Sequence, residues 1–206
     1  DAPTVSIAAP PAFVEAGNAA AQTLSATGNV DFVDLDRSDQ IDVTYQVAQA
    51  PAWSGGRLSA ALVQSLTNGF AVSANHVSVT TPVNWSYSHA AADFDFLGEG
   101  ESITFSYNVI VTDAQGQQVT APLTFVLTGS NDAPMLAAVS AISVTDTAEQ
   151  DSFASIVGSL ISSDRDVNDS ATYAVTGGSL SSRSGYDLQM DGHYGTLYLN
   201  SGTGAY

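Results

Sequence analysis

The chain has 206 residues, 44% of them hydrophobic, which is enough for one large domain or two ordinary ones, each with its own core. Its 21 acidic residues are balanced by only four basic ones, all arginine, so the net charge is −17. This excludes nucleic acid as a partner, because Lys and Arg supply the affinity for phosphate backbones. It also opposes binding to anionic lipids, and no stretch approaches 18 consecutive apolar residues, so we expect no membrane insertion. The acidity fits either simple solubility or the binding of divalent cations.

The chain has no cysteine. Many small extracellular domains are stabilised by disulfides. An extracellular protein without them needs another stabilising device, and a bound hard cation such as calcium is one candidate.

The predicted elements are almost all strands, because Val, Thr, Ser, Tyr and Phe dominate and Gly and Pro punctuate the chain. The clearest strand is 101–113, where apolar and polar residues alternate, and a Gly-containing turn joins it to a second strand at 119–129. Helical spacing at 57–66 predicts one short helix between strands. In chain order, the other expected strands are 4–8, 29–34, 41–48 and 83–88. This pattern predicts an all-β, Ig-like sandwich.

Several features recur at nearly one period. Asp1-Ala2-Pro3 returns as Asp132-Ala133-Pro134, a shift of 131, and the pattern D-x-D-x-x-D at 34–39 returns at 164–169, a shift of 130. Tyr45-Gln-Val then matches Tyr173-Ala-Val.

The recurrence predicts two units, a first repeat at 1–131 and a second, incomplete repeat at 132–206. We expect the counterpart of residues 88–131 to be missing from the second repeat, which would expose sheet edges and core.

The repeated acids predict calcium sites, because calcium binds six to eight oxygen ligands and D-x-D spacing sends two carboxylates to one side of an extended segment. The alternative is a solvated acidic turn, since Asp favours turns. The candidate ligands in these two patterns are Asp34, Asp36, Asp39, Asp164, Asp166 and Asp169.

The stretch 94–134, "FDFLGEGESITFSYNVIVTDAQGQQVTAPLTFVLTGSNDAP", resembles the C-terminal third of a VCBS-type or cadherin-like repeat. "GHYGTLYLNSGTGAY" at 192–206 is similar to a strand pair of the same repeats, which fill large bacterial RTX-type surface adhesins. The resemblance implies a tandem Ig-like array that is extracellular, exported by type I secretion, and held by calcium at the joints between neighbouring repeats. Cadherin linkers read D-x-N-D-N-A-P, whereas Gly129 stands here at the first acid and the second Asn is missing, so we expect one or two ions per joint.

The resemblance also implies which residues meet at a joint. The first unit would contribute Glu15 and the linker residues Asn131 and Asp132. It would also contribute one acid of Asp95, Glu99 or Glu101, and Glu101 is the one that we name as the ligand. Asp164 and Asp166 would approach from the second unit, while Asp34, Asp36 and Asp113 would serve the preceding joint, at Asp1. Glu149 corresponds to Glu15, and for both the alternative is an exposed loop acid.

No enzyme is expected, because the three histidines lack metal spacing and no nucleophile motif is present. Trp85 falls in a strand pattern and is expected in the core. Trp53 lies in a loop and is the better contact candidate of the two, but a packed loop aromatic is the reading that we expect for it. The predicted function is therefore a calcium-stabilised extender of a cell-surface adhesin that supports cell adhesion or biofilm formation. The alternative is a module that binds a host or surface glycan or protein through the loops 50–57 or 68–82, in an adhesin or a secreted polysaccharide-degrading enzyme.

Overall fold

The computed structural model describes residues 1–17, 21–145 and 147–206, and the chain divides into two compact units, Asp1–Asp132 and Ala133–Tyr206. The predicted all-β class is confirmed, since the described part holds one helix and otherwise strands. The strands of unit 1 are β1 (Thr4–Ile7), β2 (Phe13–Val14), β3 (Gln22–Val33), β4 (Gln40–Trp53), β5 (Phe70–Val72), β6 (His76–Ser78), β7 (Val83–Ala92), β8 (Ser102–Thr112) and β9 (Gln118–Thr128).

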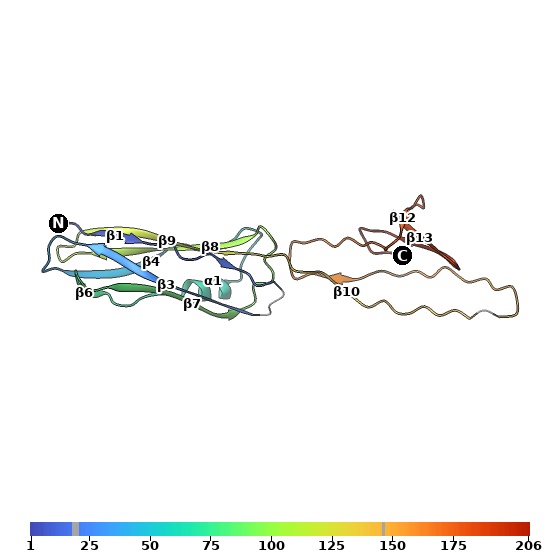
Figure 1. Ribbon diagram of the computed structural model, residues 1–206, viewed down its shortest axis with the longest axis horizontal. Helices are drawn as coiled ribbons and strands as arrows, with labels where there is room; N and C mark the ends of the chain where they lie inside the picture. The colour runs from blue at the N-terminus through green and yellow to red at the C-terminus, as the bar shows by residue number, and fades with distance from the viewer. Residues whose placement is uncertain (18–20, 146) are drawn as a thin grey trace. The chain divides into compact units, whose positions relative to one another are not determined.

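Unit 1 is a sandwich of two sheets, with strand orders β1-β3-β7-β5 and β2-β9-β8-β4-β6 (Figure 1). Side chains alternate between core and solvent along β7 and β8, as period-two patterning requires. β8 pairs with β9 from Ser102↔Thr128 to Thr112↔Gln118, so the two strands expected from sequence form one long hairpin. β4 extends five residues beyond the predicted 41–48 and ends at Trp53.

The core of unit 1 is rich in aromatic rings. Phe125 of β9 stacks on Phe105 at 5.3 Å and meets the Trp85 ring edge-on at 5.7 Å. Trp85 is only 2% exposed, which confirms its expected place in the core. Its indole lies against Gly28 of β3, where an added Cβ would approach the ring to 2.6 Å. Glycine at position 28 is therefore a packing requirement.

Helix α1 (Ala60–Thr67) lies between β4 and β5, as the spacing predicts. It starts later than expected because Ser59 is its N-cap, with its side chain accepting from the N–H of Leu62. At its other end, the hydroxyls of Tyr87 and Tyr107 both donate to the carbonyl of Leu66, at 3.0 and 3.2 Å. Burial raises the pKa of both phenols, and neighbouring Tyr45 adds to the increase at Tyr107.

Unit 2 contains the pair β10 (Met135–Leu136) and β11 (Ser162–Ser163) and a sheet of β12 (Ser179–Leu180), β13 (Leu188–Gly192) and β14 (Gly195–Leu199). Its long segments 137–145 and 147–158 carry no strand assignment in the described residues. None of the described helices is long and apolar enough to cross a membrane.

Strand pairing repeats between the units. In unit 1, Thr4 pairs with Val33 in an antiparallel ladder, and in unit 2 Met135 pairs antiparallel with Ser163. These partners are displaced by 131 and 130 residues, the same shifts that separate the two Asp-Ala-Pro and D-x-D-x-x-D motifs. The first strand pair of each unit is therefore built the same way.

Candidate functional site

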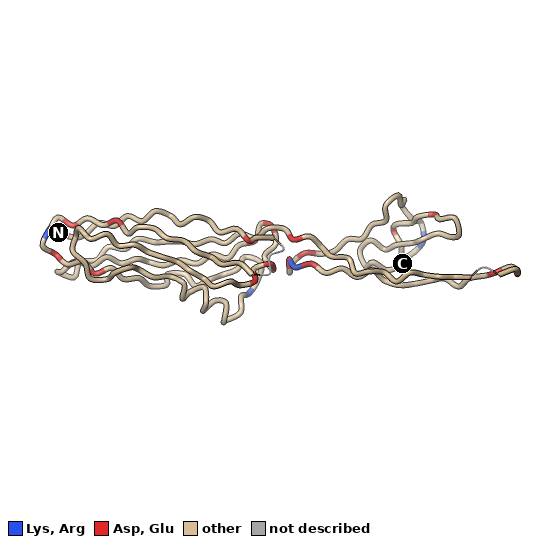
Figure 2. Tube along the Cα trace, turned by 60° about the horizontal axis from the view of Figure 1, so that its bottom comes forward, with Lys and Arg blue, Asp and Glu red and all other residues tan. Residues whose placement is uncertain are grey.

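Acidic residues gather at both ends of unit 1 and are sparse along the middle of the sandwich (Figure 2). Five acids from these ends are more than nine-tenths buried: Glu15, Asp34, Asp39, Asp95 and Asp113. Linker residue Asp132 is buried as well. Buried carboxylates are costly unless they are hydrogen bonded, paired or bound to a metal. The two ends of unit 1 are therefore the candidate sites.

The first end contains the turn that follows β3. The N–H of Asp36 donates to Oδ1 of Asp34 at 2.8 Å, and the N–H of Asp39 donates to the carbonyl of Asp36 at 2.9 Å. These bonds fold the D-x-D-x-x-D motif into a tight turn in which Asp34 and Asp39 are buried. Oδ2 of each of these two residues is buried without a hydrogen-bond partner.

The β8–β9 turn brings a further carboxylate to this end. Oδ1 of Asp113 accepts from the N–H groups of Gln115 and Gln117 at 2.9 and 2.7 Å, while its Oδ2 is buried without a partner. The register Asp42↔Thr112 places the start of β4 beside the end of β8, so Asp39 and Asp113 belong to the same end.

The α-ammonium group of Asp1 lies at this end of unit 1. It donates to Oδ2 of Asp36. The pKa of this ammonium is raised, first by that hydrogen bond and then by the charges of Asp36, Asp34 and Asp113, with desolvation acting the other way.

The second D-x-D-x-x-D motif adopts the same turn. The N–H of Asp166 donates to Oδ1 of Asp164 at 3.1 Å, and the N–H of Asp169 donates to the carbonyl of Asp166 at 3.1 Å. Asp166 is buried, whereas Asp164 and Asp169 are exposed. The motif predicted from sequence therefore encodes one local structure in both units.

At the other end of unit 1, Glu15 is held by the linker. Its Oε2 accepts from the N–H of Ser130 at 3.2 Å and from the Ser130 hydroxyl, while its Oε1 is buried without a partner. Gly17, two residues after Glu15, donates its N–H to the Ser130 hydroxyl at 3.2 Å. An added Cβ at Gly17 would lie 3.6 Å from Oδ1 of Asp132, so Glu15 and buried Asp132 lie at the same end.

The sequence left open which of Asp95, Glu99 and Glu101 is a calcium ligand, and the structure places Asp95 and Glu101 in different surroundings. Asp95 is buried, in a turn where its N–H donates to Oδ1 of Asp93 at 3.0 Å. Glu101 instead accepts from Nε1 of Trp53 at 2.9 Å and from the N–H of Gly98 at 3.3 Å. Asp95 is therefore the more buried of the two acids, and Trp53 is held by its hydrogen bond to Glu101 and by an edge-on contact with the Phe96 ring at 5.0 Å.

The remaining predicted residues are less constrained. The side chain of Asn131 donates to the carbonyl of Asp132 at 2.7 Å. Glu149 is exposed, and its N–H donates to the Thr147 hydroxyl at 3.3 Å. It lacks the burial of Glu15, its counterpart in unit 1.

As they stand, no three Asp, Glu, His or Cys side chains in the described residues form a group that could hold a metal ion. Calcium, however, also takes backbone carbonyls and water as ligands. The partnerless buried oxygens of Asp34, Asp39 and Asp113 are what a hard cation would satisfy, so the donor chemistry of the first end fits calcium.

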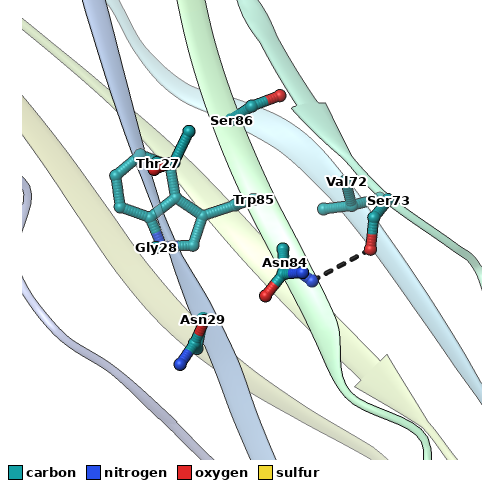
Figure 3. A pocket seen from close by; sticks show the side chains of 8 residues that line it. All are labelled: Thr27, Gly28, Asn29, Val72, Ser73, Asn84, Trp85 and Ser86. Atoms are coloured by element: carbon teal, nitrogen blue, oxygen red, sulfur yellow. Dashed lines mark hydrogen bonds between the residues drawn. The ribbon is translucent and has the colours of Figure 1, made fainter.

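A separate cavity of about 470 Å³ lies at the β3–β7 sheet (Figure 3). Its lining is neutral: besides Gly28, Val72 and Trp85 it has Thr27, Asn29, Ser73, Asn84 and Ser86. Thr27 and Asn29 flank core-facing Gly28 on β3, and Asn84 and Ser86 flank Trp85 on β7. Ser73 follows β5, and its hydroxyl accepts from the N–H of Asn84 at 2.9 Å.

No family model matches the sequence, and no curated protein matches it. Among solved structures, the chain is similar to AggA, the major subunit of aggregative adherence fimbriae type I from Escherichia coli. The two share 12% identity with a TM-score of 0.32, over 63% of this chain and 96% of AggA. This identity and this TM-score do not establish a shared fold or function.

Proposed function

We propose that the chain is a calcium-stabilised extender of a bacterial surface adhesin, in which tandem β-sandwich repeats hold a distal binding region away from the cell. Calcium is the ion proposed, with its ligands at the acidic ends of the repeats. The proposal includes an extracellular location and a role without catalysis.

The observation that carries the proposal is the set of buried carboxylate oxygens without partners at the first end of unit 1. Oδ2 of Asp34, of Asp39 and of Asp113 each lack a hydrogen bond. An unsatisfied buried polar atom costs about 1–3 kcal/mol, and more when it is charged. Divalent cations bound at this end, with backbone carbonyls and water completing their coordination, would satisfy these oxygens and reduce the repulsion between the carboxylates.

The position of the acids supports a structural role for the ion. They lie at the ends of the sandwich, where the chain enters and leaves unit 1, and not along its sheets. Linker residue Asp132 is buried, and Ser130 binds Glu15. Ions bound at such positions would limit bending at the joints, which is what an extender requires.

Calorimetric titration with calcium tests the proposal. We expect binding that Asp34→Asn weakens at least about tenfold, a loss of 1.4 kcal/mol. Asp187→Asn is the control, because its carboxylate lies outside the repeated motif and already binds Ser201 through both oxygens, at 2.7 and 2.6 Å. Absence of calcium binding, or equal losses in both variants, would refute the calcium sites.

The neutral polar cavity favours a second candidate function, recognition of a glycan by unit 1. Sugar hydroxyls pair with amide and hydroxyl side chains such as those of Asn29, Asn84 and Ser73. A glycan array probed with the intact chain and with Asn84→Ala separates the two functions. Binding that the substitution abolishes would make the chain a binding module, and an extender should bind no glycan.

A further inference from the structure

The chain enters unit 1 through β1 and leaves it after β9, at opposite ends of the sandwich (Figure 1). β1 begins at the end that holds the 34–39 turn, because Thr4 pairs with Val33, whereas β9 ends at the linker. A tensile load on the chain, such as an adhesin extender carries, therefore pulls the entry and exit points of unit 1 in opposite directions.

The strands β2 and β9 form a parallel pair, with Phe13 opposite Leu127 and Val14 opposite Thr128. The N–H of Glu15 donates to the carbonyl of Thr128 at 2.8 Å, and the Thr128 hydroxyl donates to the carbonyl of Phe13 at 3.3 Å. Because the two strands run in the same direction, the load draws β2 toward one end and β9 toward the other. They can separate only by sliding past each other, which stretches all of their hydrogen bonds at once.

A side-chain latch, formed by Glu15 and Ser130, continues this pair beyond the strands. Oε2 of Glu15 accepts from the N–H of Ser130 at 3.2 Å and from the Ser130 hydroxyl, which itself accepts from the N–H of Gly17 at 3.2 Å. Glu15 is only 4% exposed, and hydrogen bonds to an ionised carboxylate are about twice as strong as those between neutral groups. The latch therefore ties the segment after β2 to the start of the linker.

Close packing holds both sides of the pair in place. On the β2 side, the Phe13 ring stacks on the Phe125 ring at 6.2 Å. On the linker side, the N–H of Gly129 donates to the carbonyl of Glu101 at 3.0 Å, and an added Cβ at Gly129 would lie 2.3 Å from the carbonyl oxygen of Leu97. The first linker residue thus lies against the backbone of unit 1, so a pull on the linker acts along β9.

We propose that the β2–β9 pair and the Glu15–Ser130 latch form a load-bearing clamp, which keeps unit 1 folded when the chain is stretched. The inference rests on the proposed extender function and adds to it a resistance to tension that does not require calcium. The strand β1 pairs with β3 over only four residues, and the link from β1 to β2 contains Pro10 and Pro11, which have no N–H to donate. The clamp is therefore the contact that must break before the core of unit 1 opens.

Single-molecule stretching of the full chain in EDTA, with force applied at its two ends, tests the clamp. Unfolding of unit 1 is recognised by the longer release of chain, up to about 430–480 Å for 132 residues. At constant force, Ser130→Ala should unfold unit 1 about tenfold faster than the wild type, because the hydrogen bonds that it removes are those broken in the transition state. Ser130→Thr keeps the hydroxyl and should restore the wild-type rate.

Tyr107→Phe is the matched control, since it removes hydrogen bonds to the last carbonyls of α1, away from the clamp. It should lower the midpoint of urea unfolding but leave the unfolding rate under force unchanged, because these bonds are still intact while the clamp breaks. The inference is wrong if Ser130→Ala leaves that rate unchanged, if Tyr107→Phe raises it equally, or if Ser130→Thr behaves like Ser130→Ala. Because the measurement is made in EDTA, its outcome is independent of the calcium titration that tests the proposed function.

Discussion

Asp113→Asn separates the two roles of this carboxylate. The asparagine keeps Oδ1, which accepts from Gln115 and Gln117, so the turn between β8 and β9 should persist. It replaces Oδ2, the buried oxygen without a partner, by an amide NH₂ that cannot bind a cation. In EDTA the variant should be as stable as the wild type or slightly more stable, because one of several clustered like charges is gone.

The expected magnitude follows from ligand linkage. Calcium at a hundred times its dissociation constant stabilises the folded form by about 2.7 kcal/mol, and a tenfold weaker site at the same concentration by about 1.4 kcal/mol. For a domain of 132 residues, 1 kcal/mol changes Tm by roughly 4 °C. Calcium should thus raise the wild-type Tm by about 10 °C and that of Asp113→Asn by about 5 °C or less.

Intrinsic tryptophan fluorescence is the suitable assay, because both tryptophans, Trp53 and Trp85, lie in unit 1. Melts are compared in calcium and in EDTA at matched ionic strength, with exposed Asp31→Asn as a control of equal charge change. Equal calcium shifts in the wild type and Asp113→Asn would refute the assignment of Asp113 as a ligand. An equal loss in Asp31→Asn would mean that net charge, not coordination, is responsible.

Three further predictions concern packing and titration. Gly28→Ala should destabilise unit 1 by about 1–3 kcal/mol in urea unfolding, because the added methyl would meet the Trp85 indole; a change below 0.5 kcal/mol would contradict this. Tyr107→Phe should cost about 1–2 kcal/mol by removing the hydroxyl that binds the last carbonyls of α1, whereas an unchanged denaturation midpoint would show these bonds to be dispensable. Hydrogen bonds from Ser201, through its side chain and its backbone, lower the pKa of Asp187 in the folded chain, so this contribution to stability is present above the unfolded pKa and is lost as pH falls through the folded value. Ser201→Ala should raise the pKa of Asp187 in an NMR titration, and an unchanged titration would remove the hydroxyl as a cause.

Local sequence patterns were sufficient for the elements whose structure depends on near neighbours. Alternation along 101–113 and 119–129 predicts β8 and β9, and the spacing in 57–66 predicts α1, because period and capping are local properties. The D-x-D-x-x-D turn was also predictable in both units, since its hydrogen bonds join residues two or three positions apart.

The tertiary structure decided what depends on distant contacts. The sequence does not distinguish Glu101 from Asp95 as a candidate ligand. In the structure, Trp53 at the end of β4 donates a hydrogen bond to Glu101, whereas Asp95 is the acid that is buried. Glu15 binds Ser130, 115 residues away, which no local pattern indicates. The sequence by itself thus determined the all-β class, the repeat and the acidic turns, because these follow from composition and short-range spacing. Which carboxylates are buried without a partner depended on contacts that no short-range pattern contains, such as the pairing of β4 with β8 and of β2 with β9.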